Sequence, residues 1–396
     1  MADLVNIKTH ASAAGLHVVT ITPFYPTHLD DSSGCFIAES LDPLAKLGVK
    51  HTILAAQPFY RGRFCNAGKA LPAQWIRYFS LPGGTGLPMA GAFLFARIVG
   101  AMRKLHRENP IHLIHAHGAL PCGHAAMLLS HELKIPFVVS VHGLDVFSTV
   151  QVGGRAGKWC HKISSRVYAS SKRVICVSEH VREQVLLGMR SNCRTSVVYN
   201  GVDVNRFAPA SGPPATNLLL LSVGNLDRNK GHDVLLRASA ALAAEFPSLR
   251  VEIVGDGAER AALGTLTQQL GISDRVKFSG RQPRAYVADA MRRCTLFVLP
   301  SKYEGLGCVY LEAMSSGKPA VGCRGQGIAE IIQQGSNGFL IGPDNDKELA
   351  LVLSMLLKDE NRRHNIGTLA RDTVVERLSL EHQAEGLARI YRDTAA

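Results

Sequence analysis

The chain has 396 residues, of which 46% are hydrophobic and 19% charged. This length suits two domains of ordinary size, and the composition excludes a disordered chain. No apolar run approaches the ~18 residues that span a bilayer. The start of the chain lacks the basic and apolar parts of a signal peptide, so we expect a cytoplasmic location. The nine cysteines form no CxxC pair, and neither a zinc site nor a disulfide framework is predicted.

The positive charge is concentrated in the first half of the chain. Residues 1–209 hold 22 Lys and Arg against 11 Asp and Glu, net +11, and residues 210–396 hold 22 against 21, net +1, which together give the +12 of the whole chain. A basic half indicates an anionic partner, such as lipid headgroups, a diphosphate-linked acceptor or nucleic acid. General solubility explains the excess equally well.

The chain opens with the pattern of a strand, a helix and a second strand. Residues 18–22 are an apolar run that predicts a buried strand, residues 36–47 predict a helix, and residues 52–55 begin the next strand. This order implies a parallel sheet. Gly34 precedes the helix, so a phosphate or an acceptor would have access to the helix N-terminus.

Residues 58–90 are irregular in pattern, and an amphipathic helix from Met89 to Arg107 follows them. Aromatic residues beside basic ones suit contact with a membrane interface. For the helix itself we favour ordinary packing on the sheet, and the loop before it is the better candidate for a membrane or acceptor contact.

Two further predicted strands, residues 111–118 and 137–145, end in polar side chains. Ligands of open α/β sheets bind at the carboxyl ends of strands, so these side chains are placed for function. The residues are His115, His117, His142 and Asp145. They would form a metal cluster, or the three histidines, as neutral imidazoles, would donate hydrogen bonds to phosphate or sugar oxygens.

Residues 208–217 have the composition of a linker, and a new strand begins at Leu218. The loop after that strand, residues 224–231, carries Arg228 and Lys230 just before a predicted helix. Cations at this position suit a diphosphate. No G-x-G-x-x-G follows the first strand of the chain, so a dinucleotide dehydrogenase is disfavoured.

Residues 296–319 read as a strand, a glycine loop and a helix, an arrangement that offers free backbone N–H groups to a phosphate. Glu304 lies in the loop and Glu312 lies inside the helix. Carboxylates accept hydrogen bonds from sugar or ribose hydroxyls. Residues 344–346, Asp-Asn-Asp, look like a metal-binding pair of carboxylates, but their place before a helix favours a turn and a cap.

Residues 301–307, 311–314 and 317–321 closely resemble the retaining family-4 glycosyltransferases, whose signature is two glutamates separated by seven residues. The resemblance covers nearly the whole chain. It implies an α/β protein of the GT-B architecture, two Rossmann-like domains with parallel sheets facing across a cleft. The expected parts are an acceptor domain at 1–209, a nucleotide-sugar domain at 210–379 and a helix at 380–396 that returns to the first domain.

The resemblance also implies roles for individual residues. Glu304 and His142 would orient the donor sugar, Glu312 would hold the ribose, and Lys230 with Arg228 would neutralise the leaving diphosphate. The remaining donor contacts are expected at Gly34, Asp145, Gly224, Asn225, Arg281, Gly305, Leu306 and Gly307. The family has an arginine where this chain has Asn225, so we expect Arg228 to supply the missing charge. No metal and no cofactor is expected, since the nucleotide sugar is a substrate.

The sequence therefore predicts a retaining, metal-independent glycosyltransferase. UDP is the commonest donor base in the family. Residues 21–26 resemble transferases of bacterial surface polysaccharide assembly, which favours a lipid-linked glycan acceptor at the inner membrane face and no nucleic-acid partner. Two other classes stay open: a sugar-nucleotide epimerase on the same architecture, and a scaffold that binds a nucleotide sugar without catalysis.

Overall fold

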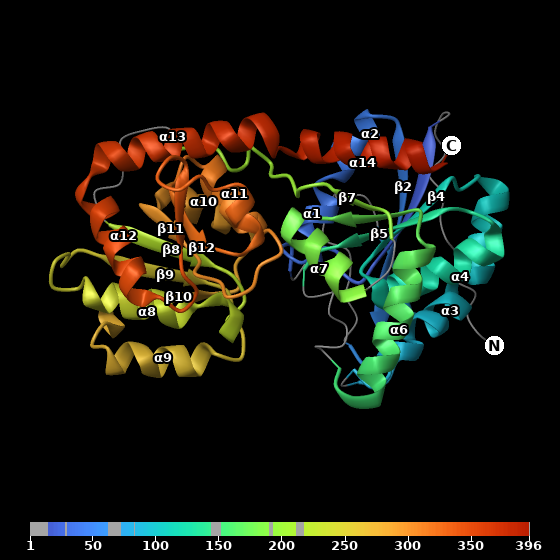
Figure 1. Cartoon of the computed structure of the whole chain (residues 1–396), viewed down its shortest axis with the longest axis horizontal. Coiled ribbons are helices and arrows are strands. Elements are labelled where there is room, and N and C mark those ends of the chain that lie inside the picture. The colour runs from blue at the N-terminus through green and yellow to red at the C-terminus, as the bar shows by residue number, and fades with distance from the viewer. Residues whose placement is uncertain are drawn as a thin grey trace. The chain divides into compact units, whose positions relative to one another are not determined.

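The computed structural model describes residues 15–27, 30–61, 73–82, 84–143, 152–189, 193–210 and 218–395. The chain divides into two compact units, one formed by residues 1–199 with 381–396 and the other by residues 200–380. Each unit is a parallel sheet covered by helices on both faces, which confirms the predicted α/β class (Figure 1).

In the described part of the first unit, the strands form a seven-stranded parallel sheet in the order β3-β2-β1-β4-β5-β6-β7. Its elements are β1 (Leu16–Thr22), α1 (Cys35–Ala38), α2 (Leu41–Lys46), β2 (Val49–Pro58), β3 (Gln74–Tyr78), α3 (Leu87–Glu108), β4 (Leu113–His117), η1 (Ala119–Gly123), α4 (His124–Leu133), β5 (Phe137–Val141), α6 (Gly154–Ser170), β6 (Arg173–Cys176), α7 (Glu179–Met189), β7 (Thr195–Val197) and, from the end of the chain, α14 (Leu380–Ala395).

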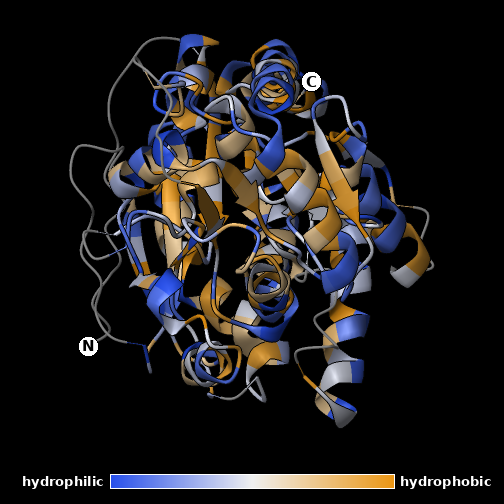
Figure 2. Ribbon diagram, turned by 90° about the vertical axis from the view of Figure 1, so that its left-hand side faces the viewer, coloured by the Kyte–Doolittle hydropathy of each residue, from blue (hydrophilic) through white to orange (hydrophobic). Residues whose placement is uncertain are grey.

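Helices α3, α4 and α6 contact one another on one face of this sheet, and α2 and α14 pack on the other (Figure 1). The strands are the apolar layer between the helices (Figure 2). Helix α14 belongs to the core of the first unit, because Leu387 and Tyr391 are buried against Val18, Leu113 and Val138. The expected return of the last helix to the first domain is therefore observed.

Two predictions for the start of the chain were wrong. The single helix expected at residues 36–47 is two short helices, α1 and α2, separated at Glu39 and Ser40. Pro43 explains the break, because it has no N–H to donate to the carbonyl four residues earlier and its ring crowds that carbonyl. The stretch expected to be irregular contains β3, a short edge strand that pairs with β2.

In the described part of the second unit, the strands form a six-stranded parallel sheet in the order β10-β9-β8-β11-β12-β13. Its elements are β8 (Leu219–Val223), η3 (Arg228–Lys230), α8 (His232–Ala241), β9 (Arg250–Val254), α9 (Arg260–Gln269), η4 (Ser273–Arg275), β10 (Val276–Gly280), α10 (Arg284–Arg293), β11 (Leu296–Val298), α11 (Cys308–Ser315), β12 (Ala320–Cys323), η5 (Gly327–Glu330), β13 (Gly338–Ile341), α12 (Asp346–Lys358) and α13 (Glu360–Arg377).

The boundary between the units lies at residue 199, ten residues before the expected position. Residues 200–209 pack within the second unit because Phe207 is fully buried there and its carbonyl accepts a 2.7 Å hydrogen bond from the Ser315 hydroxyl. Val202 also pairs with Ser379, so the two segments through which the chain passes between the units lie side by side.

No helix among the described residues combines the length and the apolar character needed to cross a bilayer.

Candidate active site

The second sheet brings two loops together where its strand order reverses. Strands β8 and β11 are neighbours, with Leu220 opposite Leu296, and β9 and β12 lie outside them. Open parallel sheets bind ligands at the carboxyl ends of the strands at such a reversal. The loop after β8 contains Gly224 and Lys230, and the loop after β11 contains Glu304. A backbone hydrogen bond of 2.7 Å from Lys302 to Asn229 joins the two loops.

Lys230 and Glu304 form an ion pair at this edge. The Lys230 ammonium lies 2.5 Å from the Glu304 carboxylate, and the side chains are only 19% and 16% exposed. The stem of Lys230 passes Gly224, where a Cβ would lie 3.7–3.8 Å from three of its carbons. Because the pair is largely shielded from water, its attraction is stronger than that of a surface pair. The structure thus brings together two residues that the sequence placed in the same site.

The loop that carries Glu304 is fixed by Gln326. The Gln326 side chain accepts a 2.9 Å hydrogen bond from the Glu304 N–H and donates a 2.8 Å hydrogen bond to the Lys302 carbonyl. The next residue, Gly327, packs so closely that a Cβ there would lie 1.7 Å from the Gly305 carbonyl oxygen. Sequence reasoning gave Gln326 no role, because a glutamine twenty-two positions away carries no signal of spacing.

Gly307 is the N-cap of α11, with a φ of 78° that favours glycine. The side chain of Leu306 is buried, so the stretch from Gly305 to Gly307 presents mainly backbone. The first N–H groups of a helix have no partner inside the helix and carry its positive dipole end. The arrangement suits an anionic oxygen, as the sequence predicted.

Glu312 is buried inside α11, and its carboxylate accepts a hydrogen bond from the guanidinium of Arg284. Arg284 is the first residue of α10, and its guanidinium also lies 4.9 Å from the centre of the Phe207 ring. This charge-assisted hydrogen bond fixes the direction of the Glu312 carboxylate. Sequence reasoning missed Arg284, because nothing in its spacing from Glu312 distinguishes it from the other arginines of α10.

Arg228 lies apart from the Lys230–Glu304 pair. Its side chain is 87% exposed and forms a 3.3 Å ion pair with Glu259. The expectation that Arg228 supplies the charge missing at Asn225 is therefore not matched by its position in this structure. Arg281 follows β10 directly and is exposed.

In the first unit, His117 and His142 lie at the carboxyl ends of the neighbouring strands β4 and β5. Their ring nitrogens are 2.9 Å apart, and the rings are stacked. The Phe36 ring lies against His142, with centroids 4.7 Å apart. Burial lowers the pKa of His142 to about 4 and puts that of His117 well below its usual value. Both rings are neutral at pH 7, so each donates from one nitrogen and accepts at the other.

His115 is directed to α14 rather than to a ligand. Its two ring nitrogens lie 2.7 Å from the Tyr391 hydroxyl and 2.7 Å from the Ser140 hydroxyl. Burial lowers its pKa to about 3. Among the residues that the structure describes, no group of three His, Cys, Asp or Glu side chains is arranged to hold a metal ion.

Two other predicted contacts belong to the first unit. Gly34 is the N-cap of α1, with a φ of 72°, and a Cβ there would lie 2.6 Å from the Phe24 carbonyl carbon. Only glycine fits this close approach. Asp145 lies outside the described residues.

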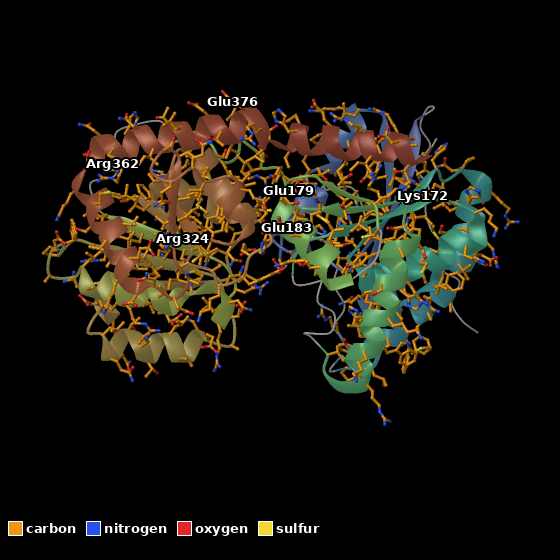
Figure 3. All side chains as sticks on the ribbon, viewed as in Figure 1. Lys172, Glu179, Glu183, Arg324, Arg362 and Glu376 are labelled. Atoms are coloured by element: carbon orange, nitrogen blue, oxygen red, sulfur yellow. The ribbon has the colours of Figure 1, made fainter. Side chains whose placement is uncertain are left out.

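Residues 344–346 form a turn and a helix cap, as predicted. The Asn345 side chain accepts a hydrogen bond from the Glu348 N–H at the start of α12. Glu348 also receives two 2.8 Å hydrogen bonds from Arg324, which is labelled in Figure 3. Asp344 pairs with Lys302 at 2.6 Å.

Two family models match this chain and together cover most of it. Residues 4–206 match the model described as Glycosyltransferase Family 4, and residues 203–373 match that of Glycosyl transferases group 1.

Several curated proteins are similar over most of their length. The putative teichuronic acid biosynthesis glycosyltransferase TuaC of Bacillus subtilis is 26% identical over 95% of this chain and 98% of its own. The D-inositol 3-phosphate glycosyltransferase of Thermobifida fusca is 30% identical over 73% and 71%. The N-acetyl-alpha-D-glucosaminyl L-malate synthase of Bacillus anthracis is 30% identical over 72% and 76%.

Solved structures share the fold. The sucrose-phosphate synthase of Thermosynechococcus elongatus superposes with a TM-score of 0.75 at 21% identity, over 96% of this chain and 98% of its own. HepE of Anabaena, crystallised with UDP and glucose, gives a TM-score of 0.73 at 20% identity, over 96% and 100%. These are structures of two Rossmann-like domains, and the two sheets of this chain match that GT-B fold.

The burial of the Arg284–Glu312 pair predicts a large cost of breaking it. Arg284→Ala would leave a buried carboxylate without its cation and should lower the stability of the second unit by about 3–5 kcal/mol. Arg228→Ala removes an exposed pair and should cost less than about 1 kcal/mol. Both tryptophans, Trp75 and Trp159, belong to the first unit, so hydrogen exchange of peptides from β8 to β13 is the measurement. Equal protection in the two variants would contradict the buried pair.

Proposed function

This chain belongs to glycosyltransferase family 4, and we propose that it is a retaining enzyme that moves a sugar from a nucleoside-diphosphate sugar to an acceptor hydroxyl. The observation that carries the proposal is the Lys230–Glu304 ion pair beside the loop from Gly305 to Gly307. The carboxyl edge of the sheet, where the strand order reverses, thus holds a cation, a carboxylate and a helix N-terminus. This combination suits a ligand with phosphate groups and hydroxyls.

We propose that Lys230 stabilises the leaving diphosphate. When the bond between the sugar and the phosphate breaks, negative charge grows on the phosphate oxygens. Lys230 and the N–H groups near Gly307 are positioned before the reaction, so stabilising this charge requires no reorganisation. In the absence of a donor, Glu304 neutralises the ammonium. A bound diphosphate would take over part of that role and leave Glu304 to accept hydrogen bonds from sugar hydroxyls.

We propose that Glu312 accepts hydrogen bonds from the ribose hydroxyls and that Arg284 holds its carboxylate in place. His142 is proposed to contact the sugar as a neutral imidazole, in keeping with its lowered pKa. The other donor contacts are proposed as the family resemblance implies them, at Gly34, Gly224, Asn225 and Arg281. Arg228 would join them only by leaving Glu259.

The proposed reaction retains configuration by attack on the front face. The bond between the anomeric carbon and the phosphate oxygen breaks, and the acceptor oxygen forms its bond to the same face of that carbon. The departing phosphate takes the proton of the acceptor hydroxyl. In this scheme the positive charge comes from Lys230 and the backbone, so we propose that no metal ion is needed.

The substrates are proposed from the relatives. HepE was crystallised with UDP-glucose, which supports UDP as the first donor base to test. The Bacillus subtilis relative is named for teichuronic acid biosynthesis, which supports a lipid-linked glycan acceptor in cell-surface polysaccharide assembly. Such an acceptor would place the protein on the cytoplasmic side of the membrane, in peripheral contact with anionic lipid through its basic first half.

One observation favours a second candidate, a scaffold that binds a nucleotide sugar without catalysis. Asn225 replaces the arginine of the family, and Arg228 pairs with Glu259 instead of filling that place. A sugar-nucleotide epimerase is the remaining alternative. Analysis of products with and without acceptor separates the three, because only a transferase makes its product conditional on the acceptor.

Replacement of Lys230 tests the proposed role directly. Lys230→Ala should lower kcat for release of the nucleoside diphosphate roughly 10²–10³-fold, since one charge-stabilising donor is lost. The matched control is Lys302→Ala, which removes a half-exposed lysine of the neighbouring loop that pairs with Asp344. It should retain activity within a few-fold. An active Lys230→Ala enzyme, or one that merely unfolds at a lower temperature, would contradict the role.

Metal removal tests the proposed mechanism. After dialysis against EDTA the enzyme should keep its initial rate of sugar transfer, because Lys230 supplies the positive charge at the leaving group. A rate that disappears with EDTA and returns with Mg²⁺ would contradict the proposal.

A further inference from the structure

Every charged residue on the outer face of helix α6 (Gly154–Ser170) is basic. The helix contains no Asp or Glu. Successive helix residues turn by about 100°, so its four basic residues and its tryptophan fall within an arc of about 100°. These residues are Arg155, Lys158, Trp159, Lys162 and Arg166, and all five are exposed. The opposite face is buried through residues such as Cys160, Ile163 and Val167.

Among the described residues of the first unit, the charges of this face have no counter-charge beside them. No residue that the structure describes forms an ion pair with Arg155, Lys158, Lys162 or Arg166. Lys158 and Lys162, and Lys162 and Arg166, are four positions apart, a spacing at which like charges destabilise a helix. The acidic pair Glu179 and Glu183, labelled in Figure 3, belongs to another helix, α7. This arrangement lowers the stability of α6 unless an anionic partner covers it.

Helix α3 shows the ordinary alternative in the same layer of helices. Arg103 of α3 pairs with Glu132 of α4, and Lys104 pairs with Glu108 at 3.9 Å. These two cations are exposed, as are those of α6, but each has a carboxylate beside it. Arg107 of α3 has no ion pair with a described residue, so what distinguishes α6 is that four basic residues share one face without a carboxylate among the described residues.

The shape and composition of the face favour a lipid surface. Residues 155 to 166 span about 16 Å along a straight helix, and a convex helix face of this length can lie against a flat surface. Tryptophan prefers the interface between water and hydrocarbon, and Trp159 lies among the cations. Single-stranded nucleic acid needs several aromatic side chains for stacking, whereas this face has one.

A second set of exposed apolar side chains lies in the first unit, just after β3 and on α3. The Phe79 and Phe93 rings are in contact, 5.2 Å between centroids, and both are exposed. Phe79 follows β3, and Phe93 is near the start of α3, a helix that contacts α6. The first unit thus exposes apolar as well as basic side chains, a combination that interfacial membrane proteins use.

We propose that the outer face of α6 binds the anionic headgroups of a lipid bilayer, with Trp159 at the interface. This inference rests on the membrane contact within the proposed function and names its surface. The sequence pattern alone had directed attention to residues 58–90, and it gave α6 no role.

The test compares two variants of the full chain that remove equal charge from the same unit. Lys158→Gln with Lys162→Gln changes the unpaired cations, and Arg103→Gln with Lys104→Gln changes paired ones. Binding is measured by sedimentation with phosphatidylcholine vesicles that contain or lack phosphatidylglycerol. Each cation near an anionic surface strengthens binding roughly fivefold, so the α6 variant should bind about 25-fold more weakly. The α3 variant should stay within about threefold of the natural chain, whose binding requires phosphatidylglycerol.

Several results would overturn the inference. If both variants bind the vesicles as tightly as the natural chain, or if both lose the same affinity, α6 is not the membrane-binding surface. Peripheral contact through another surface of the first unit would then still be possible. If the natural chain ignores phosphatidylglycerol, the membrane contact itself is wrong. Thermal stabilisation by UDP, measured on the same samples, shows separately whether the donor site is intact. Tighter binding to single-stranded DNA than to vesicles would identify a nucleic-acid surface instead.

Fluorescence supplies an independent reading of the same contact. Trp159 emission should shift to shorter wavelength on phosphatidylglycerol vesicles, and Trp159→Phe should abolish the shift because Trp75 is the only other tryptophan. A shift that persists in Trp159→Phe would show that Trp159 is not at the interface.

Discussion

The ion pair between Lys230 and Glu304 is the interaction on which the second unit's proposed chemistry depends. It forms because β8 and β11 are adjacent, so two loops separated by some seventy residues meet at one edge of the sheet. Gln326 hydrogen-bonds to the backbone of the Glu304 loop, and Gly327 packs closely against Gly305 of the same loop. The pair holds the ammonium and the carboxylate in a fixed arrangement before a ligand arrives. In the proposed scheme a diphosphate would replace Glu304 as the anionic partner of Lys230, so binding of the donor would require little new desolvation of the ammonium.

Glu312 of α11 is also paired with a cation, and its carboxylate is buried. A buried carboxylate is unfavourable without a cation, and Arg284 supplies one while stacking on Phe207. Phe207 belongs to the segment that leads into the second unit, so the proposed ribose contact is supported by the chain's own entry into that unit. In the first unit, burial keeps His117 and His142 neutral, and the hydroxyl of Tyr391 ties α14 to His115.

The sequence predicted most of the fold, since the strands expected within residues 18–22, 111–118 and 296–319 are observed as β1, β4 and β11. The family resemblance placed Lys230 and Glu304 in one donor site, and the structure brings them together because β8 and β11 are neighbours. Sequence reasoning failed where long-range packing decides. Arg228 forms its ion pair with Glu259 of a distant loop. Arg284 and Gln326 bind Glu312 and the Glu304 loop, which lie far from them in the chain. Strand β3 is too short for its hydrophobic pattern to predict a strand. The basic face of α6 could not be predicted from the sequence, because its interpretation depends on which carboxylates of the described neighbouring helices lie beside it.

The most direct test of the donor site is thermal stabilisation of the natural chain and of Lys230→Ala by UDP, GDP, ADP and NAD at matched concentration. A ligand at a hundred times its Kd adds about 2.7 kcal/mol of stability. We predict a rise with one nucleoside diphosphate that is strongly reduced in Lys230→Ala. No rise with any of the four, or a rise that Lys230→Ala leaves unchanged, would contradict the assignment of this edge of the second sheet as the donor site.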